Sequence, residues 1–188
     1  MNSATAQTRQ HYFSTFQLIL LALFSVLVVV AKVVLHLPLH IPGHSGVFWM
    51  AILVVTRGLV PKAGALSLVG LTSGLIATFM GIGNKGPLYT ILSYLSAGVA
   101  VDLVSLFLGG VNNIVSAGLA GLAGNVAKVL TKALMAIILE IPAGFIALGF
   151  AFFIFTNVVA GALGGVLGWF ILRALHKAGF FVYLEEKK

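Results

Sequence analysis

Long apolar runs, separated by short clusters of glycine, proline and polar residues, occupy most of this chain of 188 residues. The first run extends from Phe16 to Leu35 and contains Lys32 as its only charged residue. Because a helix needs about 20 apolar residues to cross a hydrocarbon core of roughly 30 Å, this run is long enough for one membrane span. Only 8% of the residues are charged, whereas a soluble domain carries about 25%. The sequence therefore predicts an all-α integral membrane protein.

The breaks between the runs divide the chain into elements. They predict a six-transmembrane-helix bundle with spans at residues 16–35, 45–60, 63–82, 88–108, 114–139 and 143–172. The second span is short for a perpendicular crossing. We expect one membrane domain over residues 16–172, a cytoplasmic tail over residues 1–15 and a cytoplasmic cap over residues 173–188.

Lysine and arginine are enriched in the cytoplasmic loops of membrane proteins. With the amino terminus inside, Lys32 and Lys85 lie on the outer side, and seven of the 11 basic residues lie on the cytoplasmic side: Arg9, Arg57, Lys62, Arg173, Lys177, Lys187 and Lys188. This asymmetry predicts a multi-pass protein of the plasma membrane with both termini in the cytoplasm. It also accounts for the net charge of +7, so we expect membrane lipid and not nucleic acid around the chain.

Three of the five histidines stand close together in the loop between the first and second runs, at His36, His40 and His44. Imidazole is the commonest transition-metal ligand, and Pro38 and Pro42 hold the backbone in a rigid path that can aim the rings inward. His40 and His44 are therefore candidate ligands for nickel, cobalt, zinc or copper. The alternative is that all three are ordinary polar residues of an interfacial loop, which could hydrogen-bond an organic ligand.

The segment Gly81–Gly86 matches the spacing of a dinucleotide-binding loop. It links two apolar runs instead of a strand and a helix, so no nucleotide site is expected. Its free amides, with Asn84, Lys85 and the nearby Tyr89, are candidates to bind a polar or anionic solute; the alternative is a plain tight turn. Asn157, in the middle of the last run, needs a hydrogen-bond partner from a neighbouring helix or from the solute.

Three ionisable residues fall inside predicted spans away from the span ends, namely Asp102, Lys128 and Lys132. Each costs about 3 kcal/mol near the centre of a bilayer unless a partner offsets it. The two lysines lie on one helix face, so a buried pair between Asp102 and one of them is the economical expectation. The alternative is that the fifth helix begins later and that both lysines extend to the cytoplasmic interface.

Small residues form a stripe along the last run, with two overlapping G-x-x-x-G patterns at Gly161/Gly165 and Gly164/Gly168. Such patterns let helix backbones approach closely in lipid. We expect the stripe to serve either helix packing within the chain or the docking of another membrane subunit.

The chain contains no hydrolase, metalloprotease or P-loop motif, and only four acidic residues. It also contains no cysteine. We therefore expect no enzymatic activity and no intrinsic cofactor, and a transition metal, if bound, would be a substrate.

Six spans, cytoplasmic termini, a long first outer loop and a glycine-rich last span before a basic tail resemble the substrate-binding S component of energy-coupling factor (ECF) importers. The local similarity is strongest at Leu39–Gly43 and at Ala162–Gly168 before Arg173, and His40-Ile41-Pro42 is similar to a string in the nickel and cobalt members. The resemblance implies a bundle that captures a micronutrient, either a vitamin-like small molecule or a transition-metal ion, on its outer side. It further implies that the first outer loop closes over the solute. The partners it implies are a transmembrane coupling subunit and two ATPase subunits, which would hydrolyse the ATP.

Two other function classes fit the sequence. A stand-alone channel or secondary carrier could use Asp102 and Lys128 as an ion or proton relay. A structural membrane subunit would bind no solute at all.

Cysteine-accessibility labelling tests the orientation. In Ser3→Cys and Lys187→Cys variants, an impermeant maleimide should react only after cells are permeabilised, because both termini are expected in the cytoplasm. Lys85→Cys, in a loop expected outside, is the control and should react in intact cells. Labelling of either terminus in intact cells contradicts the predicted topology.

Overall fold

The structure is a computed structural model that describes residues 12–34, 44–82, 86–138 and 146–180. These residues form six helices and no strand, which confirms the all-helical prediction. The helices are α1 (Thr15–Val34), α2 (His44–Leu59), α3 (Ala65–Phe79), α4 (Pro87–Phe107), α5 (Ile114–Ile138) and α6 (Ile146–Lys177).

The largest difference from the predicted boundaries is at the end of α6. The helix continues to Lys177, through the first residues of the predicted cytoplasmic cap. No glycine or proline interrupts the chain between Gly168 and Gly179, and Gly179 adopts the left-handed conformation, with φ of 76°, that commonly follows a helix end. Basic residues in the last turn also suit the negative end of the helix dipole.

Four helices, α1, α4, α5 and α6, are long and apolar enough to cross a membrane. The apolar parts of α2 and α3 are shorter, at Gly46–Leu59 and Ala65–Phe79. At 1.5 Å per residue the 16 residues of α2 extend about 24 Å, which is less than the roughly 30 Å of a hydrocarbon core. These four helices support an all-α membrane protein. That α2 and α3 also cross the whole membrane stays a prediction.

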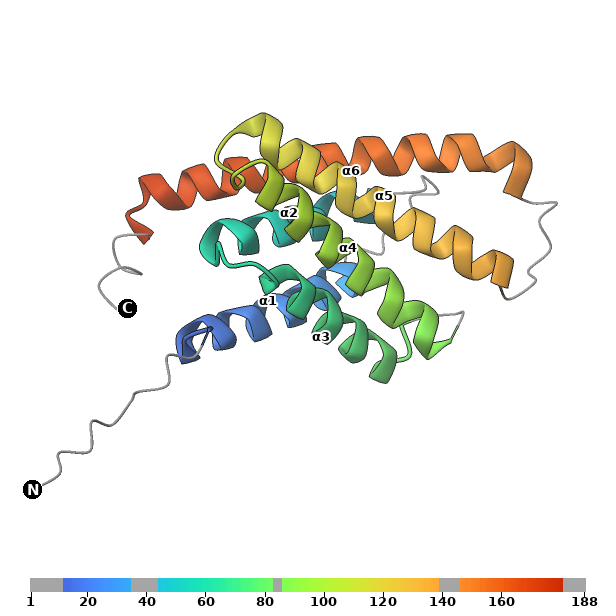
Figure 1. The fold of residues 1–188 in the computed structure, drawn as a ribbon, viewed down its shortest axis with the longest axis horizontal. Helices are drawn as coiled ribbons and strands as arrows, with labels where there is room; N and C mark the ends of the chain where they lie inside the picture. Colours follow the sequence, from blue (N-terminus) through green and yellow to red (C-terminus); the bar gives the residue numbers. More distant parts are fainter. Residues whose placement is uncertain (1–11, 35–43, 83–85, 139–145, 181–188) are drawn as a thin grey trace, which may run out of the picture.

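The short helix α2 lies at the centre of the bundle, where it contacts all five other helices. Every residue from Trp49 to Arg57 except Ile52 is buried. The other helices surround α2, with α3 against α1, α4 against α3, α5 against α4 and α6 against α5 (Figure 1). A helix that is apolar on all sides fits such a position, because it has no polar face that must stay in contact with water.

The glycines of α6 bring two neighbours close to it. Gly161 and Gly165 face α5, and a Cβ added to Gly165 would lie 2.1 Å from the carbonyl oxygen of Ala117. Gly164 and Gly168 face α2, and a Cβ added to Gly164 would lie 2.5 Å from the carbonyl oxygen of Val47. All four positions are therefore occupied by helix packing within the chain, and the alternative expectation of a docking surface at these glycines is wrong.

Two glycines one turn apart on α5 test this packing. Gly121→Ala would place a Cβ 2.3 Å from the carbonyl oxygen of Gly161, so the α5 and α6 backbones must move apart. Gly118→Ala would place its Cβ 3.6 Å from the side chain of Val166, which is an ordinary contact. Gly121→Ala should lower the stability of the detergent-purified protein by about 1–3 kcal/mol, measured by thermal melting. An equal effect of Gly118→Ala would contradict close α5–α6 packing.

Candidate solute-binding site

Two cationic and two aromatic side chains from four helices meet near the end of the bundle where α1 ends and α2 begins. The indole of Trp49 on α2 and the phenol ring of Tyr94 on α4 have centroids 5.7 Å apart. The Nζ of Lys128 on α5 lies 4.1 Å from the Trp49 ring centroid, and the Nζ of Lys32 on α1 lies 5.3 Å from that of Tyr94. These distances are within the range of cation–π attraction. We call these four residues the cation–aromatic cluster.

Helix packing sets the register that brings the cluster together. Gly124 of α5 packs against Met50 of α2 and Val101 of α4, with a Cβ position 2.6 Å from the Val101 side chain. The helices α4 and α5 run in opposite directions (Figure 1). Lys128, one turn after Gly124, therefore lies toward Tyr94, which is two turns before Val101.

Three buried polar atoms around the cluster have no hydrogen-bond partner in the part of the chain that the structure describes. They are Nε1 of Trp49, Oη of Tyr94 and Oδ1 of Asn125, which lies one turn before Lys128 on α5. The Trp49, Tyr94 and Asn125 residues are only 5%, 4% and 0% exposed. Because an unpaired polar group in a dry interior costs about 1–3 kcal/mol, these atoms indicate that a further molecule, either water or a solute, completes the site.

The cluster also carries positive charge that no described acidic side chain balances. Asp102 is the one acidic residue among the described residues, and it is bound elsewhere. Lys128 is further subject to repulsion from Lys132 and Lys32. Since like charges at membrane depth are costly without a counterion, the arrangement favours an anion at this position.

The expected pairing of Asp102 with Lys128 or Lys132 is wrong. Nη1 of Arg57 lies 3.4 Å from Oδ1 of Asp102, and both side chains are 4% exposed. The backbone N–H and the hydroxyl of Ser67 donate to Oδ2 of Asp102 at 2.8 and 2.9 Å. The Asp102 carboxylate lies slightly more than two turns beyond Tyr94 along α4, toward the opposite end of the bundle from the cluster. The last turn of α2, which sequence reasoning placed at the cytoplasmic surface, is buried and supplies the partner.

Only some of the other predicted site residues lie in the part of the chain that the structure describes. His36, His40, Asn84 and Lys85 lie outside the described residues, and His44 is the first residue of α2 with a side chain that is likewise not described. The predicted metal site at His40 and His44 is therefore untested, and the described residues contain no group of three metal-ligating side chains.

Tyr89 and Asn157 are both described. Tyr89 is partly buried in the first turn of α4. Asn157 is buried, and its side-chain amide donates to the carbonyl of Phe153 at 2.8 Å. The side chain of Asn125 donates to the backbone carbonyl of Asn157 at 3.0 Å. Through Asn125, the helix α5 thus links Asn157 to the region around Lys128.

Comparisons with protein-family models, with curated proteins and with solved structures gave no match.

Sequence reasoning missed the cluster as a unit. Lys32 was visible as the only charge in the first apolar run, and Lys128 as a charge inside the fifth. Trp49 and Tyr94 carry no such signal, because an aromatic residue in an apolar run is more often part of a core. Asn125 was visible only as a polar residue in a glycine-rich stretch.

A double-mutant comparison tests the Arg57–Asp102 pair. Asp102→Asn should lower the melting temperature, because it leaves Arg57 as a buried charge without a partner. Adding Arg57→Met should recover part of that loss, whereas adding Lys128→Met should leave the loss unchanged. Recovery by Lys128→Met and not by Arg57→Met would contradict the pairing.

Proposed function

We propose that this chain is the solute-binding membrane subunit, or S component, of an ECF-type importer, and that it captures a micronutrient at the cation–aromatic cluster. The observation that carries the proposal is the meeting of Lys32, Trp49, Tyr94 and Lys128 at one end of the bundle. The helix α1 ends and α2 begins at that same end of the bundle, and the resemblance to ECF S components implies an outer loop between them that closes over the solute.

The polar groups of the cluster favour an organic anion over a metal ion. Two ammonium groups, an indole N–H and a phenol hydroxyl are all hydrogen-bond donors. A carboxylate or phosphate would accept these hydrogen bonds and offset the charge of Lys32 and Lys128. A metal cation would be repelled by the same two lysines. The cluster therefore supports a vitamin-like acid, and a metal site would have to lie at the histidines of the outer loop.

The aromatic rings favour a solute with a flat ring. The Lys128 and Lys32 ammonium groups lie over the rings of Trp49 and Tyr94. A solute anion would draw the ammonium groups toward itself and leave the ring faces to an apolar or aromatic part of the solute. The proposed solute thus combines an acidic group with a planar ring.

Energy coupling would come from other subunits. The chain has no P-loop motif, so import against a gradient would require a transmembrane coupling subunit and two ATPase subunits. A stand-alone carrier with an Asp102–Lys128 relay has less support, because Asp102 is bound by Arg57 and Ser67.

Native mass spectrometry of the purified protein tests the solute site. The wild type should retain a small organic acid, and Lys128→Met should reduce retention by about tenfold or more, as expected for the loss of one charge-assisted hydrogen bond. The control is Lys177→Met, at the carboxyl end of α6 and outside the cluster. It removes the same charge, and this variant should retain the acid as the wild type does. Equal retention by both variants, or retention of a metal ion that survives Lys128→Met, would contradict the site.

A copurification experiment tests the importer class separately. An S component should copurify with ATPase subunits and should not transport in liposomes without them. Transport by the chain alone, driven by an ion gradient, would contradict the ECF assignment and leave the solute site intact.

A further inference from the structure

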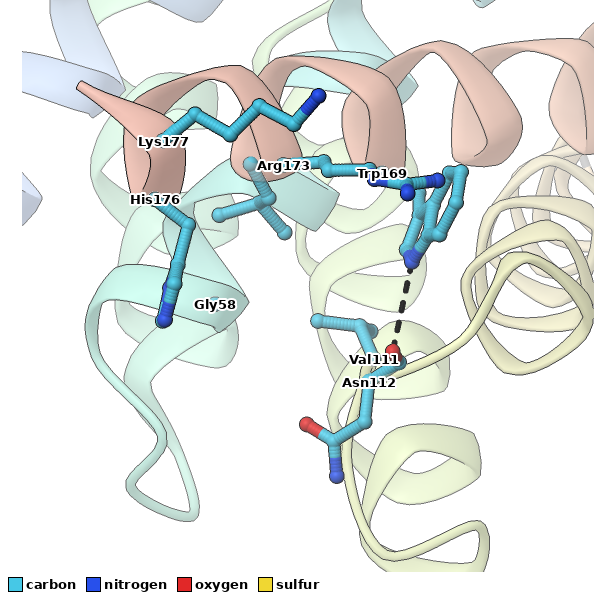
Figure 2. A pocket seen from close by; sticks show the side chains of 8 residues that line it. Gly58, Val111, Asn112, Trp169, Arg173, His176 and Lys177 are labelled. Carbon is cyan, nitrogen blue, oxygen red and sulfur yellow. Dashed lines mark hydrogen bonds between the residues drawn. The ribbon is translucent and has the colours of Figure 1, made fainter.

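A second polar site lies at the opposite end of the bundle from the cation–aromatic cluster. It is a groove of about 530 Å³ between the last turns of α6, the end of α2 and the turn that joins α4 to α5. The lining residues that the structure records are Gly58, Val111, Asn112, Trp169, Leu172, Arg173, His176 and Lys177. We call it the basic groove, and Figure 2 shows it from close by.

The basic groove has one charged side and one apolar side. Trp169, Arg173 and Lys177 follow one another at four-residue spacing, so they lie along one face of α6. The guanidinium carbon of Arg173 lies 5.3 Å from the Trp169 ring centroid. Figure 2 shows the Arg173 and Lys177 side chains both extending along α6 toward Trp169. The apolar side is formed by Val111 and Leu172, which are both buried.

The indole of Trp169 fixes the groove to the α4–α5 turn. Its Nε1 donates to the carbonyl of Asn112 at 3.4 Å, as the dashed line in Figure 2 marks. Both Arg173 and Lys177 are exposed. The one acidic residue among the described residues, Asp102, is held by Arg57 and Ser67, so it does not neutralise either cation.

From the length of α6 we expect the basic groove to lie at the level of lipid head groups. The helix has 32 residues and is about 48 Å long, whereas a hydrocarbon core of roughly 30 Å accommodates about 20 residues. Arg173 and Lys177 stand in the last turns of the helix, beyond the apolar part that the core can cover. Trp169 lies one turn earlier, at a depth where tryptophan is enriched in membrane proteins.

We infer that the basic groove binds the phosphate group of an anionic phospholipid. The Arg173 and Lys177 side chains would hold the phosphate oxygens, and Val111, Leu172 and the Trp169 ring would contact the glycerol and the first part of the acyl chains. We assign it as a lipid site and not a second solute site, because the groove has an apolar side on which acyl chains can lie. It does not depend on the function proposed for the cation–aromatic cluster.

Native mass spectrometry of the full-length protein in detergent, with added lipid, tests the inference. Phosphatidylglycerol should bind more tightly than phosphatidylcholine with the same acyl chains. Each basic residue near a membrane surface contributes about fivefold in affinity for an anionic lipid. Arg173→Gln and Lys177→Gln should therefore each weaken phosphatidylglycerol binding by about fivefold and weaken phosphatidylcholine binding less, because the choline cation already offsets the charge of its phosphate.

Three controls separate this site from its alternatives. Lys62→Gln removes a charge at the same end of the bundle but outside the groove, and it should keep the lipid preference. Thermal melts should be unchanged for Arg173→Gln and Lys177→Gln, because both side chains are exposed. Inorganic phosphate at millimolar concentration should not displace phosphatidylglycerol, since it lacks the acyl chains that contact the apolar side.

Several outcomes would overturn the inference. Equal binding of both lipids by the wild type, or an unchanged preference in both variants, would show that the groove does not recognise the net negative charge of the lipid head group. Displacement by inorganic phosphate would assign the groove to a free anion. A preference that appears only after Glu185→Gln and Glu186→Gln would mean that the chain's own acidic tail occupies the groove.

Discussion

The enclosure of α2 is the constraint on which the rest of the structure depends. This helix is too short to match a hydrocarbon core, and nearly all of its residues from Trp49 to Arg57 are buried. The helix α6 approaches it closely where α6 lacks side chains, at Gly164 and Gly168. Because packing and not water drives helix association in lipid, a bulkier residue at these points would separate α6 from α2 and loosen every contact that α2 organises.

The two ends of α2 present different polar chemistry to the surrounding helices. Near its beginning, Trp49 joins Tyr94 and two lysines in a cluster with unpaired donors and excess positive charge. Near its end, Arg57 pairs with Asp102, whose remaining oxygen accepts two hydrogen bonds from Ser67. The second site has its main charges matched, so removing either partner is expected to destabilise the bundle. Lys32 and Lys128 of the first site have no acidic partner among the described residues, which is why the first site is the better candidate for a solute.

Much of the architecture follows from local composition. Apolar runs and the glycine and proline clusters between them place the six helices within a few residues, because helix length and membrane insertion are decided by the segment itself. The candidate site was much harder to predict from the sequence. Tyr89, Asn157 and Lys128 were singled out as individual residues, but Lys128 was assigned the wrong partner. The four residues of the cluster come from four helices, so no pattern along the chain connects them.

The sequence by itself thus determined that the chain is helical and suited to a membrane, which residues each helix contains, and that Asp102 and Lys128 need compensation inside it. Only the tertiary structure decided how that compensation is made. Asp102 and Arg57 are 45 residues apart, and Lys128 is brought over Trp49 by the close approach of α5 to α2. The physical reason is that the rotation of α5 and α6 about their axes is set by glycine-mediated contacts with more than one neighbouring helix at once. Such contacts are a property of the assembled bundle and not of any one segment.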